Sequence, residues 1–88
     1  MVSKKEFKEE VRSLAKRIDA VPKQVRICSL KGRIGSCSPS KVISFDIGVL
    51  ELDPVSRREA IIHELLHIRY KNHGKLFKAM LATYLDTE

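Results

Sequence analysis

Three histidines and one glutamate stand at a spacing that can hold and use a metal ion. The chain's only histidines are His63, His67 and His73, and Glu64 directly follows the first of them. Because residues four apart on an α-helix lie about one turn apart on the same face, His63 and His67 can offer two imidazole nitrogens to one ion. Zinc accepts imidazole nitrogens in a tetrahedron, and a catalytic zinc site leaves one position for water. The spacing therefore predicts a zinc site.

Glu64 has the position of a proton carrier. It lies about 100° round the helix from His63, so it flanks the metal face without being directed at the ion. A carboxylate there suits a general base that takes a proton from the attacking water and returns it to a leaving amine. We expect Glu64 to be the catalytic residue of a hydrolase. Tyr70 or an arginine could stabilise the oxyanion, and the spacing does not choose between them.

His73 is the expected third ligand. Its offset from His67 does not fit one straight helical face, so we expect the helix to end between the two residues. Asn72 can adopt the left-handed conformation that turns a chain, and Gly74 follows His73. Such a turn would bring His73 back toward the metal.

The helix that carries the site should form the centre of the domain. Asp53 is a favoured N-cap, and Pro54 suits the first helical position. An apolar arc lies opposite the histidines and requires cover on most sides. Its members are Ile61, Ile62, Leu65, Leu66 and Ile68.

Two further helices are expected at the ends of the chain. Ser3 and Glu6 form a capping box for a helix over residues 4–19. After Gly74 an apolar stripe at helical spacing predicts a short closing helix. The stripe consists of Leu76, Phe77, Met80, Leu81, Tyr84 and Leu85.

Three short strands are expected between the first helix and the metal helix. Alternating residues predict strands at 25–30, 34–37 and 42–47, with a turn at 31–33. The sequence thus predicts one α+β domain over residues 1–88, with a three-stranded, mostly antiparallel sheet.

Two separated motifs resemble the YgjP-like metallohydrolases, which are related to the SprT-like and WLM metalloproteases. The first is Gly35-Ser36-Cys37-Ser38. The second is His63-Glu64-Leu65-Leu66-His67, continued by Asn72-His73-Gly74-Lys75-Leu76-Phe77. The resemblance runs from about Val25 to Leu81, and Ile34 stands where the family usually has tryptophan. It implies a zincin-like fold, zinc bound by the three histidines, and Glu64 as catalytic carboxylate.

The same resemblance suggests where a substrate would bind. In zincin-like folds the strand before the metal helix borders the cleft, and an extended substrate can pair with such an edge. That strand would lie within residues 42–47, which makes Val42, Ile43, Ser44 and Phe45 candidates for substrate contact. The alternative is an ordinary sheet strand. Another zincin branch takes its third ligand from a glutamate, so Asp86 and Glu88 are weaker alternatives to His73.

Two cysteines do not form a disulfide framework. With a two-residue turn at Gly32-Arg33, Cys28 and Cys37 would be direct cross-strand partners that could oxidise. We expect reduced core thiols instead, as is usual in a cytoplasm. A cysteine ligand to zinc is the weaker alternative, since three histidines suffice.

The charge and hydropathy of the chain limit its partners. Seventeen Lys and Arg against eleven Asp and Glu give a net charge of +6. A basic surface can attract nucleic acid. Here the charges are scattered, so a solvated surface is favoured and a role near DNA stays open. No apolar run approaches the roughly 18 residues of a membrane span, and we expect a soluble cytoplasmic protein.

These observations lead to one expectation and two rivals. The first is a zinc metallopeptidase that acts on a peptide or protein substrate. The second is a non-peptidase metallohydrolase. The third is a catalytically silent module that binds DNA or protein and keeps zinc for stability, for which a closed site with four protein ligands would be expected.

Overall fold

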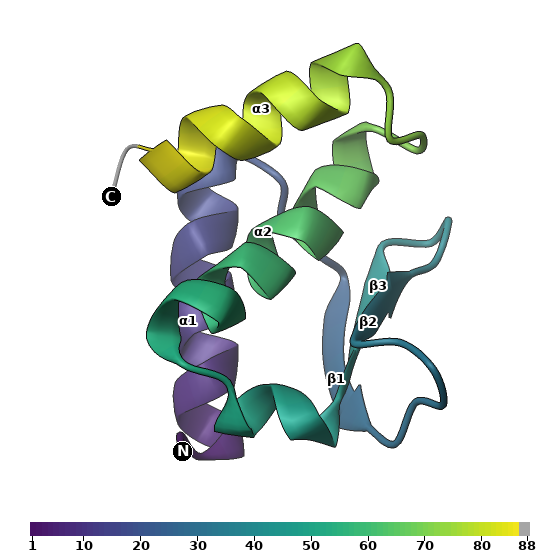
Figure 1. Cartoon of the computed structure of the whole chain (residues 1–88). Coiled ribbons are helices and arrows are strands. Elements are labelled where there is room, and N and C mark those ends of the chain that lie inside the picture. Colours follow the sequence, from purple (N-terminus) through teal and green to yellow (C-terminus); the bar gives the residue numbers. More distant parts are fainter. Residues whose placement is uncertain (87–88) are drawn as a thin grey trace.

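The computed structural model describes residues 1–86, which form three α-helices and a small sheet (Figure 1). This arrangement confirms the predicted α+β class. The elements in chain order are α1 (Lys4–Ile18), β1 (Gln24–Cys28), β2 (Gly35–Cys37), β3 (Val42–Asp46), the short 3-10 helix η1 (Ile47–Glu51), α2 (Pro54–Arg69) and α3 (Lys75–Asp86).

The first helix begins at the predicted capping box. The Ser3 hydroxyl accepts a hydrogen bond from the Glu6 N–H at 3.1 Å, and the Glu6 carboxylate accepts one from the Ser3 N–H at 3.0 Å. These bonds satisfy amide groups that the first turn of a helix leaves without partners. The helix then buries a single apolar face, made of Phe7, Val11, Leu14, Ala15 and Ile18.

The sheet is mixed, with the strand order β1-β3-β2. β3 pairs in parallel with β1 and antiparallel with β2. The turn expected at residues 31–33 therefore does not make β1 and β2 neighbours, and the sheet is not mostly antiparallel. The connection over residues 29–34 is longer than a two-residue turn, and the Leu30 N–H donates to the Asp46 carboxylate at 2.8 Å. This bond holds the connection at the end of β3, so that β2 returns on the other side of β3.

The strand order separates the two cysteines. Cys28 is in register with Asp46, and Cys37 is in register with Ile43, on opposite edges of β3. Two strand spacings amount to about 9.5 Å, which exceeds the roughly 7 Å between Cα atoms that a disulfide can span. Both thiols are free. The alternative of a cross-strand pair, which required a two-residue turn at Gly32-Arg33, is therefore excluded.

Helix α2 lies at the centre and packs against α1, α3 and β2 (Figure 1), and Phe7 of α1 also contacts Phe45 of β3 directly. It begins at the predicted N-cap, where the Asp53 carboxylate accepts from the Ser56 N–H at 3.1 Å. The predicted arc is buried at Ile61, Ile62, Leu65 and Leu66, and Ile68 is half-buried against the same core. None of the helices within residues 1–86 has the length and apolar character needed to span a membrane.

Candidate metal centre

The turn after α2 brings the third histidine back to the first two. The helix ends at Arg69, between His67 and His73 as predicted. Tyr70 caps it in an extended conformation, with φ −128° and ψ 109°, and its N–H donates to the Leu66 carbonyl at 2.7 Å. The expected left-handed Asn72 is wrong, because within residues 1–86 only Asp19, Lys41 and Gly32 have positive φ. An extended residue, rather than a left-handed one, redirects the chain.

The three imidazoles converge. One ring nitrogen from each of His63, His67 and His73 lies within 4.8 Å of the others. The Nε2 atoms of His67 and His73 are 2.8 Å apart. Among the described residues this is the one such cluster, so Asp86 takes no part in it, and Glu88 lies outside the described residues.

These nitrogens suit a tetrahedral metal ion. With bonds of roughly 2.0–2.1 Å, tetrahedral ligand nitrogens stand about 3.4 Å apart. The observed nitrogens, all within 4.8 Å of one another, lie near that spacing. Three described ligands also differ from the four of a closed structural site.

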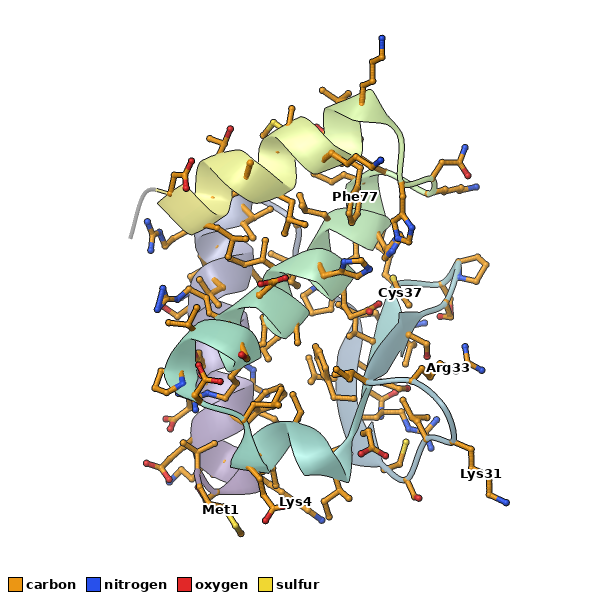
Figure 2. The ribbon with its side chains drawn as sticks, in the orientation of Figure 1. Met1, Lys4, Lys31, Arg33, Cys37 and Phe77 are labelled. Atoms are coloured by element: carbon orange, nitrogen blue, oxygen red, sulfur yellow. The ribbon has the colours of Figure 1, made fainter. Side chains whose placement is uncertain are left out.

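Two neighbours hold the rings in place. Nδ1 of His67 lies 3.2 Å from the Tyr70 carbonyl oxygen, and a hydrogen bond there fixes the ring with its Nε2 toward His73. Phe77 of α3 is 2% exposed, and its ring centroid lies 5.2, 4.9 and 4.8 Å from those of His63, His67 and His73. Figure 2 shows Phe77 reaching from α3 toward α2. The sequence placed Phe77 in the apolar stripe and at the end of the second motif, and its contact with all three rings was missed.

Burial favours the neutral form of His63. Desolvation lowers the pKa of His63, and the neighbouring His67 and His73 lower it further. A metal ion requires neutral imidazole ligands. The environment of His63 therefore favours the state that can bind metal.

Glu64 is buried between α2 and β2. The residue is 9% exposed, and its burial raises the pKa of the carboxyl group, with opposing effects from His73 and Arg33. A Cβ atom built on Gly35 would lie only 2.9 Å from Cγ of Glu64 and 3.2 Å from its Oε2. The backbone of β2 therefore lies directly against the carboxylate. No sequence signal indicated this contact, although Gly35 belongs to the first motif.

A cleft opens beside these residues. One part has a volume of about 480 Å³ and is lined by all three histidines, Glu64 and Cys37. A second part of about 560 Å³ extends along the first half of α2 and shares Arg33, Gly35, His63 and Glu64 with the first. Glu64 thus lies where the two parts of the cleft meet. Burial and the nearby Glu64 also raise the pKa of the Cys37 thiol.

The strand at this cleft is β2, not β3. Residues 42–46 pair with β1, and residues 43–45 also pair with β2. The candidates Val42, Ile43, Ser44 and Phe45 therefore lie on the central strand, and their assignment to a free edge is wrong. The side chains of Ile43 and Phe45 are apolar and 0% exposed. A central position in the sheet suits a strand whose side chains are buried in this way.

The outer edge of β2 is free to pair with another chain. The Asp46 N–H donates to the Ile34 carbonyl at 2.7 Å, and the Ser38 N–H donates to the Val42 carbonyl at 2.9 Å. Alternate residues of an antiparallel strand direct their N–H and C=O groups to opposite edges. Gly35 and Cys37 therefore present these groups away from β3.

Comparison with known proteins agrees with this fold and site. The model of the YgjP-like family, described as a YgjP-like metallopeptidase domain, matches residues 2–87. The chain therefore belongs to the YgjP-like family of metallopeptidase domains, and it is a metallopeptidase. No curated protein matches it.

Two solved structures are similar to this chain. The crystal structure of the metallopeptidase zymogen of Methanocaldococcus jannaschii jannalysin has a TM-score of 0.78 and 28% identity, over 89% of this chain and 80% of that one. The crystal structure of the metallopeptidase zymogen of Pyrococcus abyssi abylysin has a TM-score of 0.75 and 24% identity, over 85% of this chain and 75% of that one. The second likeness concerns the fold alone.

Proposed function

We propose that the chain is a zinc-dependent peptidase in which His63, His67 and His73 hold the metal and Glu64 transfers the proton. The convergence of three ring nitrogens within 4.8 Å carries this proposal. Imidazole nitrogen is a common zinc ligand, and three protein ligands are typical of catalytic zinc. When bound, zinc supplies Lewis acidity that polarises a carbonyl group and acidifies water.

The proton chemistry belongs to Glu64. Its burial raises its pKa, so it holds a proton more readily than an exposed glutamate does. It takes the proton of the attacking water and delivers it to the leaving amine nitrogen. The Tyr70 carbonyl and the Phe77 ring act earlier, by orienting the histidines before substrate arrives.

The substrate backbone pairs with the free edge of β2. Gly35 and Cys37 direct their peptide groups toward the cleft side, and an extended peptide can add a strand there. Methylating one peptide nitrogen of a good substrate at a time tests this pairing. A methyl group on a paired nitrogen should raise KM severalfold, because it removes one hydrogen bond, and uniform effects along the peptide would contradict the pairing.

Replacement of Glu64 tests the catalytic role. Glu64→Gln keeps the shape of the side chain but removes the proton acceptor, so we expect kcat to fall by about 10²–10⁴-fold. Zinc content, measured by elemental analysis, should remain that of the parent protein. A variant that keeps its zinc and its full turnover would remove Glu64 from the mechanism.

The substrate class is tested separately. Purified zinc-loaded protein is offered a peptide library and a set of small amides, and the products are read by mass spectrometry. Cleavage within the peptides supports a peptidase. Turnover of small amides alone would indicate a different metallohydrolase.

We also propose that residues 1–88 work as one domain in the cytoplasm. One continuous core joins all three helices to the sheet, and two separated free thiols suit a reducing compartment. Cell fractionation with an antibody against the native chain tests the location.

A further inference from the structure

We propose that the cleft selects peptides with an acidic side chain on one side of the scissile bond, through Arg33, Lys41 and Lys71. This inference rests on the proposed peptidase function and adds the substrate class. The three cations line the part of the cleft that contains the histidines. Glu64 is the sole carboxylate among the described residues that line this part.

The three cations are free to meet a ligand. All three residues are exposed, and within residues 1–86 none of their side chains forms an ion pair or a hydrogen bond. They come from separate segments: Arg33 precedes β2, Lys41 precedes β3, and Lys71 follows α2. Three segments thus place positive charge around one opening. Charges of one sign around a concave site raise the local concentration of ligands of the opposite sign.

Lys41 occupies an unusual backbone position. Its φ is +68°, in the left-handed region that favours glycine or asparagine over lysine. The turn over residues 38–41 is held by the Lys41 N–H, which donates to the Ser38 carbonyl at 3.0 Å. Lysine at position 41 therefore costs more backbone strain than glycine or asparagine would, although neither of those residues would bring a positive charge. Such strain often accompanies a functional role.

The two parts of the cleft differ in character. The second part shares Arg33, but it also contains Glu59 and the apolar side chains of Ile34, Leu52 and Ala60. The Glu59 carboxylate offsets the charge of Arg33, the one cation among the described residues that line this second part. We therefore expect the acidic preference on one side of the scissile bond and an apolar preference on the other.

The preference is measured with matched peptides that differ only by Glu or Gln at a single position. Glutamine has nearly the shape of glutamate, so the ratio of the two kcat/KM values isolates the charge. An exposed ion pair of the usual strength corresponds to roughly a two- to fivefold ratio per cation. At low ionic strength we expect a Glu/Gln ratio of about tenfold or more at the best position, which falls toward one at about 1 M salt.

Single variants assign the charge. Arg33→Gln, Lys71→Gln and Lys41→Asn should each lower the Glu/Gln ratio, and asparagine tolerates the left-handed backbone of position 41. Lys31→Gln is the matched control. Lys31 lies in the same loop as Arg33 and is exposed, but it lines neither part of the cleft, and Figure 2 shows it extending from the loop into solvent. This control should leave the ratio unchanged.

Binding gives a second reading that does not require turnover. Fluorescently labelled Glu and Gln peptides are titrated into zinc-loaded Glu64→Gln protein, alone and combined with Arg33→Gln or Lys31→Gln. Tighter binding of the Glu peptide, lost with Arg33→Gln but not with Lys31→Gln, supports the proposal even if no peptide is cleaved. Equal binding of the two peptides overturns it.

A nucleic acid is the competing ligand for a basic cleft. A short single-stranded oligonucleotide is therefore added to the same titration. If it displaces the Glu peptide at lower concentration than an unlabelled Glu peptide does, and Arg33→Gln weakens it equally, the cations serve nucleic acid and the proposal fails. Displacement only at much higher concentration supports the peptide assignment.

Discussion

Gly35→Ala should disable Glu64 without disturbing the metal. The new Cβ would lie 2.9 Å from Cγ of Glu64, half an ångström closer than the 3.4 Å at which ordinary contact begins. Gly35 does not have positive φ, so alanine fits the backbone and the effect is one of contact alone. β2 is hydrogen-bonded to β3, and α2 is packed on the core, so the glutamate side chain is the part that yields.

The magnitude follows from that displacement. A shift of about half an ångström at Cγ is carried further at the carboxylate, and a misplacement of about 1 Å can cost about 10²-fold in rate. We expect kcat to fall between about tenfold and a hundredfold, while zinc affinity changes little. If the strand yields instead, the free energy of unfolding should fall by about 1–3 kcal/mol, as for an overpacked core.

A steady-state assay on one good peptide substrate, zinc titration and thermal unfolding separate these results. Gly74→Ala is the matched control, because a Cβ atom at Gly74 meets nothing within 4 Å and its φ is not positive. If Gly35 acts through Glu64, adding Gly35→Ala to Glu64→Gln should cause little further loss of kcat. Full turnover in a folded, zinc-loaded Gly35→Ala protein would refute the reasoning.

Three further predictions concern the metal centre. Phe77→Ala should lower the free energy of unfolding by about 3–5 kcal/mol and weaken zinc binding, as measured by chemical denaturation and chelator competition, with Phe77→Leu as the milder comparison. His73→Ala should weaken zinc by more than the roughly 10–100-fold typical of an outer-shell change, and its circular dichroism should stay that of the parent protein. Metal-free Glu64→Gln should be more stable than the metal-free parent at neutral pH. Burial raises the pKa of Glu64 above its value of 4.5 in the unfolded chain. Between the unfolded and the folded pKa, a rise in pH ionises Glu64 more readily in the unfolded parent, so the parent loses stability. The difference in melting temperature between variant and parent should open in this pH range and level off above it. Equal melting temperatures at pH 7 would mean that the buried carboxylate carries no penalty.

The sequence predicted those parts of the structure that depend on local spacing. The helix of His63 and His67 follows from its apolar period and from the Asp53 cap, and the end of this helix before His73 follows from the offset between His67 and His73. Ser3 and Glu6 form the predicted box because both partners lie within one turn. In each case the deciding contact joins residues close in the chain.

The sheet could not be predicted in this way. Its order depends on contacts between residues far apart in the chain, such as the bond from the Leu30 N–H to Asp46, which joins residues 16 positions apart. Alternation identified three strands but carried no information about which one lies in the middle. The assignment of the edge to residues 42–45 failed for that reason, and the same strand order excludes the alternative in which Cys28 and Cys37 are cross-strand partners.

The observed strand order changes which residues we propose to meet a substrate. Successive side chains of a strand alternate between two faces, so Gly35 and Cys37 share one face of β2, and Arg33 lies in the loop that leads into the strand. Arg33 brings charge, Gly35 leaves room for Glu64, and Cys37 lines the cleft farther along. Under these proposals, the backbone of β2 would pair with a peptide and leave clearance for Glu64, and Arg33 in the preceding loop would supply the charge that selects a side chain. Substitutions on β2 should consequently alter kcat and substrate preference, whereas substitutions of His63 and His67 on α2 should weaken the metal site.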